Sequence, residues 1–168
     1  AQNQNKYVIQ SKNNWCNEKS DHNFHFWHDF ETSVFPPNNW LLVSNNTTQT
    51  WQLADTSIAL PLSGHNFAIC RYDHTLNPQG QDEKLITEPI NLIGLEDAKL
   101  EFWFFFSKFW GISPNNNYDL QVLVSTDGGI NFNDTIWTEI STDTAAWNSW
   151  DWVKAEVDIS NYINNNDV

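Results

Sequence analysis

The segment 100–110 is dominated by aromatic residues, whose flat rings can stack on sugars and other apolar surfaces. Side chains of a strand alternate between two faces, which places one set together: Leu100, Phe102, Phe104 and Phe106. Trp103 and Phe105 fall on the opposite face. An antiparallel sheet usually keeps one face for water. We therefore expect a ligand, a partner chain or a covering loop over Trp103 and Phe105.

A second pair of aromatic residues is expected beside that face. In the strand predicted at residues 150–159, alternation places the apolar side chains on the core face: Val153, Ala155, Val157 and Ile159. Trp150 and Trp152 are left on the outer face. The predicted ligand-binding residues are therefore Trp103, Phe105, Trp150 and Trp152. The alternative is that these rings only fill a core.

The elements that must position these rings are short strands in one domain. The 168 residues suit a single domain, with residues 1–22 forming a polar, extended arm or linker and residues 23–168 forming the folded body. Turn-forming Pro, Gly and Asn clusters separate the strand-like runs, and no segment has the pattern of an amphipathic helix. An antiparallel β-sandwich is expected. The predicted strands are residues 24–31, 40–43, 50–53, 66–72, 84–87, 99–107, 118–126, 135–140 and 150–159.

The net charge argues against nucleic acids and anionic membranes as partners, and the composition favours an extracellular location. With a net charge of −13 and only 8 Lys and Arg residues, the chain lacks the basic surface that nucleic acids and anionic membranes attract. No apolar segment approaches the roughly 20 residues needed to span a bilayer. The chain has no Met and opens Ala1-Gln2-Asn3, as expected after removal of a signal peptide. We expect a protein that is secreted or held at the extracellular cell surface.

The 2 cysteines, Cys16 and Cys70, allow two interpretations. In an exported protein they could form a disulfide that ties the arm to the body. Alternatively they are unrelated thiols, and Cys70 behaves as a small buried apolar residue on a strand.

Sequence motifs give no indication of catalysis. The Ser125–Gly129 turn fits the Asp-box pattern, which is a structural hairpin in most proteins that carry it, and its Asp-Gly and Gly-Gly pairs favour a tight turn. The chain contains no nucleophile elbow, HExxH motif or glycine-rich phosphate loop. We expect a protein that is not an enzyme. A glycan-active enzyme remains the third alternative, since glycosidase carboxylates leave no local signature.

An ordered set of short motifs resembles the cleaved-adhesin domains, also called choice-of-anchor J domains. Across residues 29–162 the set comprises Asp29-Phe30-Glu31, Phe35 to Trp40, Trp51, Asp82 before Leu85 to Ile90, Ala98 to Phe102, the Ser125–Gly129 turn, Trp137, Trp150, and Val157 to Ser160 with Tyr162. The resemblance implies a jelly-roll β-sandwich related to MAM and carbohydrate-binding modules. It also implies a secreted bacterial surface protein or adhesin, often stabilised by calcium.

The resemblance also suggests ligands for a structural calcium ion. Glu31 and Asp82 match acidic positions of the family, and Asp29 and Asp158 are further candidates. Carboxylates that converge at one edge of a sandwich supply the oxygen ligands that calcium prefers. The alternative is that these acids are turn caps and solvated edge residues.

One departure from the family pattern concerns residues 164–168, where the sequence stops although such domains continue into one or two more strands. We expect a jelly roll that lacks its final strand or strands in this chain, which is either a fragment of a longer protein or completed by a strand of another chain.

The sequence therefore leaves two functions open. The first is a non-catalytic adhesin or carbohydrate-binding module that recognises a glycan or a cell-surface or matrix protein. The second is a structural subunit of a cell-surface assembly, held to neighbouring copies.

Overall fold

The computed structural model describes residues 5–10, 26–72, 80–142 and 148–168. Nearly all of its regular elements are strands: β1 (Asn5–Gln10), β2 (Leu41–Val43), β3 (Trp51–Asp55), β4 (Asn66–Tyr72), β5 (Lys84–Ile86), β6 (Lys99–Phe105), β7 (Gln121–Val124), β8 (Asp134–Thr138) and β9 (Trp152–Asp158). The single α-helical turn, α1 (Lys108–Gly111), and two 3-10 turns complete the described elements. None of the described helices has the length and apolar character to cross a membrane. The protein is all-β, as predicted.

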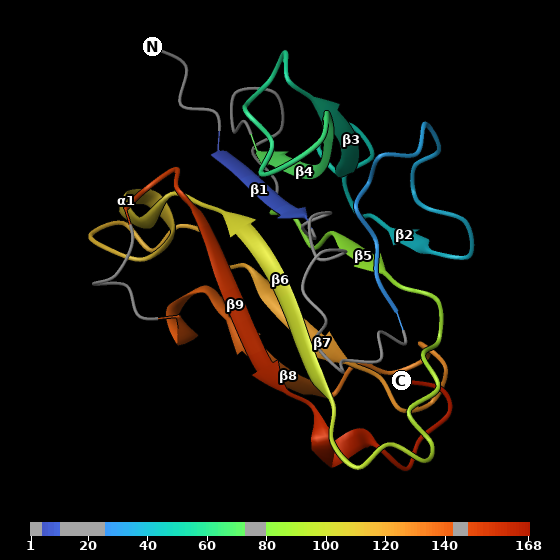
Figure 1. Cartoon of the computed structure of the whole chain (residues 1–168). Helices are drawn as coiled ribbons and strands as arrows, with labels where there is room; N and C mark the ends of the chain where they lie inside the picture. Colours follow the sequence, from blue (N-terminus) through green and yellow to red (C-terminus); the bar gives the residue numbers. More distant parts are fainter. Residues whose placement is uncertain (1–4, 11–25, 73–79, 143–147) are drawn as a thin grey trace.

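The strands form one large and two small antiparallel sheets (Figure 1). The large sheet has the order β3-β4-β1-β6-β9, and β2-β5 and β7-β8 form the small sheets. Side chains of both small sheets, including Leu42, Leu85, Val122 and Trp137, belong to the same hydrophobic core as β4, β6 and β9. The small sheets therefore pack against one face of the large sheet, which we call the core face. Its opposite face is the outer face.

Strand β6 lies in the core as its alternation predicts. Phe102, Phe104 and Phe106 are 5%, 0% and 0% exposed. Phe102 pairs with Ala155 of β9, and Phe104 pairs with Val153. Both partners pack in the core, so the predicted core face of the last strand is also confirmed there.

Two segments near the N-terminus differ from what the composition suggests. Residues 1–22, expected to be an extended arm, include β1, which pairs with both β4 and β6. Residues 26–31, expected to continue a strand, are irregular. Asp29 Oδ1 accepts the backbone N–H of Glu31, and Phe30 has a positive φ of 62°. This local turn bends the backbone away from an extended conformation, so the predicted strand is wrong over residues 26–31.

Candidate functional site

The outer face of β6 and β9 brings the predicted aromatic residues together. Across the two strands, Phe105 pairs with Trp152 and Trp103 pairs with Lys154. The Phe105 ring centroid lies 5.4 Å from that of Trp152 and 5.5 Å from that of Trp150. All four aromatic residues are partly exposed. We call Trp103, Phe105, Trp150 and Trp152 the aromatic platform.

Trp150 holds an unusual backbone conformation within the platform. Its φ is 67°, in the left-handed region that a bulky side chain rarely adopts. Its backbone N–H donates a 3.0 Å hydrogen bond to the carbonyl oxygen of Phe106, which directly follows β6. The core residue Phe106 thereby fixes the turn that presents the Trp150 ring beside Phe105. Strained residues of this kind cluster at binding and catalytic sites.

Part of the outer face is covered by the chain itself. Phe67 and Ile69 of β4 are buried on this side of the sheet, with Ala59 and Trp152 packed against them. Trp152 meets Phe67 edge to face at 6.4 Å, and its indole N–H donates a 3.0 Å hydrogen bond to the carbonyl oxygen of Leu60. The chain itself therefore covers part of Trp152, and Phe105, for which a covering loop was one of the three expected explanations, packs against the same buried cluster. The Leu60 side chain is 80% exposed at the edge of this cover.

Charged side chains continue the platform along the same two strands. The Lys154 ammonium pairs with Glu101 at 3.2 Å and also with Glu156. Lys99 pairs with Glu101 at 3.0 Å and with Glu156 at 3.6 Å. Hydrogen bonding to Glu101 raises the pKa of Lys99, and hydrogen bonding from Lys154 lowers the pKa of Glu156. The outer face thus combines flat apolar rings with an adjacent row of hydrogen-bonding groups.

Phe67 and Ile69 of β4, which lie against Phe105 and Trp152 on the outer face, were not predicted as part of the site. Phe67, Ala68, Ile69 and Cys70 are consecutive apolar residues, and all four are buried. A short continuous apolar run is typical of a strand covered on both faces. This signal was available in the sequence and indicates that the outer face is partly packed.

Two of the predicted calcium ligands lie in the turn before β2, where each accepts backbone hydrogen bonds. Glu31 Oε1 accepts the N–H groups of His65 and Asn66 at 2.8 and 2.9 Å. Asp29 Oδ1 accepts the N–H of Glu31 at 3.1 Å. Both carboxylates therefore act as turn caps in this structure.

The other two predicted ligands also have local partners. Asp82 pairs with Lys84, and Asp158 Oδ1 accepts the backbone N–H of Ser160 at 2.9 Å. Within residues 26–72, 80–142 and 148–168, no three His, Cys, Asp or Glu side chains are grouped to hold a metal ion. The predicted ligands are not brought together as carboxylates of one cluster, and calcium binding stays a prediction.

Cys70 is a free cysteine on β4, 4% exposed. Burial is the main cause that raises the pKa of its thiol to about 12. Cys16 lies outside the described residues, so the predicted disulfide between them stays a prediction.

Comparison of the chain with protein-family models, with curated proteins and with solved structures finds no match. The resemblance to the cleaved-adhesin domains therefore stays a prediction that rests on the short motifs.

Proposed function

We propose that this protein is a non-catalytic recognition module that binds glycan through the aromatic platform on the outer face. The observation that carries the proposal is the gathering of Phe105, Trp150 and Trp152, with ring centroids 5.4 to 5.5 Å apart around Phe105. Sugars present apolar C–H faces that stack on such rings, and rigid rings bind at a small entropic cost.

The charged neighbours of the platform suit the rest of a sugar. Glu101 and Glu156 carry acceptor oxygens, and Lys154 carries donor N–H groups, next to Trp103. A sugar stacked on the rings would direct its hydroxyl groups toward these side chains. Polar groups placed beside an apolar surface are the general means by which a binding site fixes ligand orientation.

The fold proposed for this module is a jelly-roll β-sandwich. The packing of both small sheets on one face of the large sheet through a shared core supports it. We further propose that the module is exported and acts as an adhesin at a cell surface, where a glycan or a matrix protein is the partner. The composition and the motif resemblance support this part of the proposal.

The proposal is tested by glycan-array binding of the unmodified protein and of Trp150→Gly. Glycine tolerates the φ of 67°, so this change removes the ring without straining the backbone. Loss of one stacking contact worth about 1.4 kcal/mol weakens binding roughly tenfold. Trp27→Gly is the matched control, because Trp27 is 62% exposed and lies outside the platform.

Two results would contradict the proposal. One is the absence of binding by the unmodified protein to any glycan on the array. The other is glycan binding that Trp150→Gly leaves unchanged, since the ligand would then lie elsewhere on the molecule.

A further inference from the structure

The outer face of β6 and β9 changes in chemical character along the strands. Side chains two residues apart on a strand share a face, so the cross-strand pairs on this face form successive rows. The three rows, in order, are Phe105 with Trp152, Trp103 with Lys154, and Glu101 with Glu156. The first row is aromatic, the second is mixed and the third is acidic. A ligand that lies along the two strands therefore meets apolar rings at one end and charged groups at the other.

The three rows together are longer than one sugar ring. Residues 101 and 105 of β6 are separated by roughly 13 Å, at 3.3–3.4 Å per residue of a strand. Trp150 extends the aromatic end, because its ring centroid lies 5.5 Å from that of Phe105. A chain of several sugar units matches this length better than a single terminal sugar does.

The charged end of the face is an interlocked set of ion pairs. Glu101 and Glu156 stand directly opposite each other, and like charges in such a pair destabilise a sheet unless they are neutralised. Lys154 pairs with both carboxylates, at 3.2 Å from Glu101. Lys99 also pairs with both, at 3.0 Å from Glu101 and 3.6 Å from Glu156. We call these four residues the charge ladder, in which two lysines balance two glutamates.

A ligand can reach the charge ladder from solvent. The side chains of Glu101, Lys154 and Glu156 are 32%, 27% and 46% exposed. Hydroxyl groups can donate to the carboxylates and accept from the ammonium groups without breaking an ion pair. The charge ladder therefore suits the hydroxyl groups of a sugar.

A charged ligand would disturb the charge ladder. An anion that recruited Lys154 or Lys99 would leave Glu101 and Glu156 to repel each other across the strands. The net charge of −13 also slows the approach of an anion. An ammonium group that approached the carboxylates would compete with the two lysines and be repelled by both. Sugars that carry carboxylate, sulfate or amine groups are therefore disfavoured.

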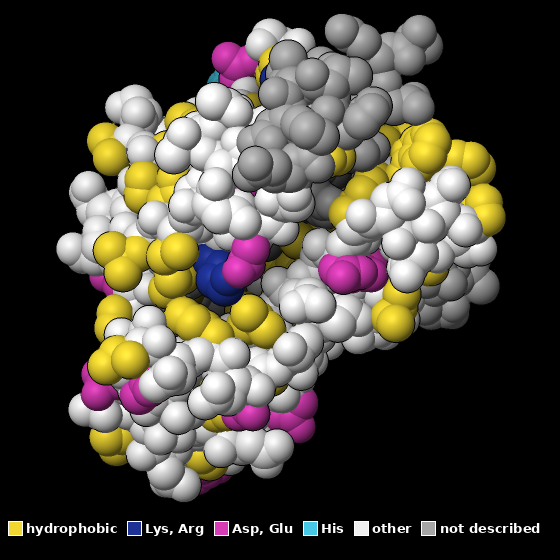
Figure 2. Space-filling model, turned by 180° about the vertical axis from the view of Figure 1, so that it is seen from behind, with side chains coloured by type: hydrophobic (Ala, Val, Ile, Leu, Met, Phe, Trp, Pro, Cys, Tyr) yellow, Lys and Arg dark blue, Asp and Glu magenta, His cyan; other side chains and the backbone are white. Residues whose placement is uncertain are grey.

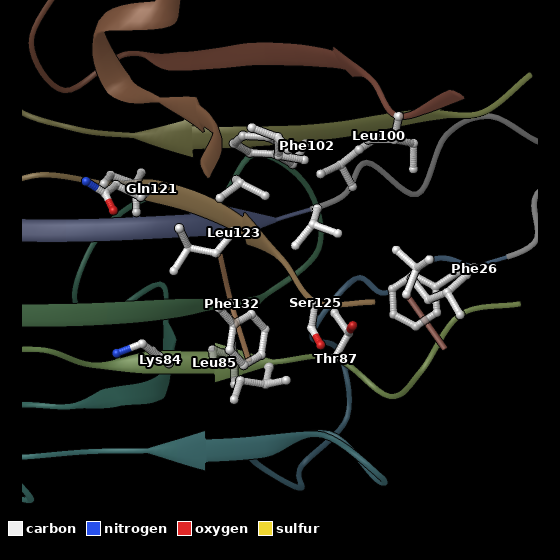
Figure 3. Close-up of a pocket in the computed structure, with 18 of the residues that line it drawn as sticks. Phe26, Lys84, Leu85, Thr87, Leu100, Phe102, Gln121, Leu123, Ser125 and Phe132 are labelled. Carbon is white, nitrogen blue, oxygen red and sulfur yellow. The ribbon is translucent and has the colours of Figure 1, made fainter. Parts of the chain in front are cut away.

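The other side of the large sheet has a different character. A pocket there is lined by apolar side chains that include Leu85, Leu100, Phe102 and Leu123 (Figure 3). Figure 2 shows hydrophobic side chains gathered around a hollow on this side of the molecule. A sugar placed against them would bury hydroxyl groups beside apolar atoms, which is costly. The outer face, which combines rings and polar groups, is the better site for a sugar.

We propose that the ligand of the aromatic platform is an uncharged oligosaccharide that lies along β6 and β9. Its apolar C–H faces stack on the rings, and its hydroxyl groups form hydrogen bonds with the charge ladder. This inference rests on the proposed glycan-binding function and narrows it to one class of sugar.

Matched oligosaccharides test the preference for an uncharged chain, with the linkage taken from the glycan array. The probes are a chain of neutral hexoses, the same chain with a carboxylate in place of each hydroxymethyl group, and the same chain with an amine in place of one hydroxyl group of each unit. By calorimetry, the unmodified protein should bind the neutral chain about tenfold more tightly than either charged chain. Equal or tighter binding of a charged chain overturns the inference. A single neutral hexose that binds as tightly as the chain contradicts a ligand that spans the three rows.

Glu101→Gln tests whether the charge ladder sets this preference. The change removes the like-charge pair with Glu156, so the lysines can pair with an anionic sugar and the preference for the neutral chain over the carboxylate chain should shrink. Glu88→Gln is the matched control, because it changes the net charge equally at a residue outside the platform, where Glu88 Oε2 accepts from Asn39. If both variants shrink the preference equally, the overall charge decides and the inference is wrong. Near-UV circular dichroism verifies that each variant keeps its fold.

The proposed function and this inference fail in different ways. If none of the chains binds, glycan binding itself is wrong and the inference falls with it. If a charged chain binds best and Trp150→Gly weakens that binding, the platform is a glycan site and only the preference for an uncharged sugar is wrong.

Discussion

Two acidic residues of the β7–β8 region, Asp127 and Glu139, have shifted pKa values. Each should make the folding stability of this protein depend on pH. Asp127 is exposed in the turn, where the backbone N–H of Asn131 and the hydroxyl of Ser125 donate to it and lower its pKa to about 2. Glu139 is buried after β8, and desolvation raises its pKa although the backbone N–H of Leu120 donates to it at 2.9 Å. The two groups therefore affect stability in opposite directions as the pH changes.

Asp127→Ala should lower the Tm at pH 7 because the turn loses the acceptor for Asn131 and Ser125. The folded pKa lies below the ordinary value of 3.8, so this stabilisation is present above pH 3.8 and is lost as the pH falls through about 2. The difference in Tm between variant and unmodified protein should therefore shrink as the pH falls from 3.8 toward 2. Circular dichroism melts across pH 2 to 7 measure it, with Asp97→Ala as the control for an exposed acid outside the turn. A difference that does not change with pH would contradict the role of the carboxylate.

Glu139→Gln should keep the acceptor for Leu120 and remove the buried charge. Because the folded pKa is raised, the contribution of Glu139 to stability is greatest below the ordinary value of 4.5 and falls as the pH rises above it. The Gln variant should show a flatter pH profile and no loss of stability at pH 7. Glu139→Ala leaves the Leu120 N–H unpaired and should cost roughly 1–3 kcal/mol. Urea unfolding at pH 4.5 and 7 measures this, and equal destabilisation by Gln and Ala at pH 7 would overturn the argument.

At the scale of elements, the alternation of side chains along a strand correctly predicted which residues of β6 lie in the core. It predicted the core positions of β6 because the run is long, aromatic and uninterrupted up to Phe106. It could not identify β1, whose neighbours in sequence are mostly polar and which forms only by pairing with β4 and β6. It also predicted a strand over residues 26–31, where side-chain caps at His28 and Asp29 bend the backbone instead. Local patterns fail where distant pairing or local capping decides the conformation.

The α1 turn after β6 offers a test of close packing. A Cβ atom on Gly111 would lie 2.1 Å from the ring of Phe106, which is fully buried. Gly111→Ala should therefore displace Phe106 and destabilise the protein by about 1–3 kcal/mol. Gly80→Ala is the matched control, because among the described residues beyond its chain neighbours no atom lies within 4 Å of the added Cβ. It should change stability by less than about 0.5 kcal/mol. Urea unfolding compares the two, and similar values would contradict the packing argument.

At the scale of the whole molecule, the large sheet separates two kinds of surface. Its core face meets the small sheets, and its outer face carries the platform. Strand alternation predicted that Trp103 and Trp152 lie on the outer face, whereas Trp150 precedes β9 and is placed by the turn that hydrogen-bonds to Phe106. It could not predict that Phe67 and the carbonyl of Leu60 cover part of Trp152, because those contacts join segments far apart in the chain.

Calcium is the remaining prediction that involves the whole chain, since its candidate ligands come from three separate regions. Glu31 lies before β2, Asp82 before β5, and Asp158 at the end of β9. If calcium joins such regions, binding to the folded state alone raises the Tm by mass action.

We expect EGTA to lower the Tm of the unmodified protein, and we expect Glu31→Gln to remove this dependence on calcium. Gln can still accept from His65 and Asn66, so the variant retains the turn. Differential scanning calorimetry in calcium and in EGTA measures the effect, with Glu88→Gln as the control. An unchanged Tm in EGTA would leave these carboxylates as turn caps and ion-pair partners, which are the roles that their observed hydrogen bonds already fill.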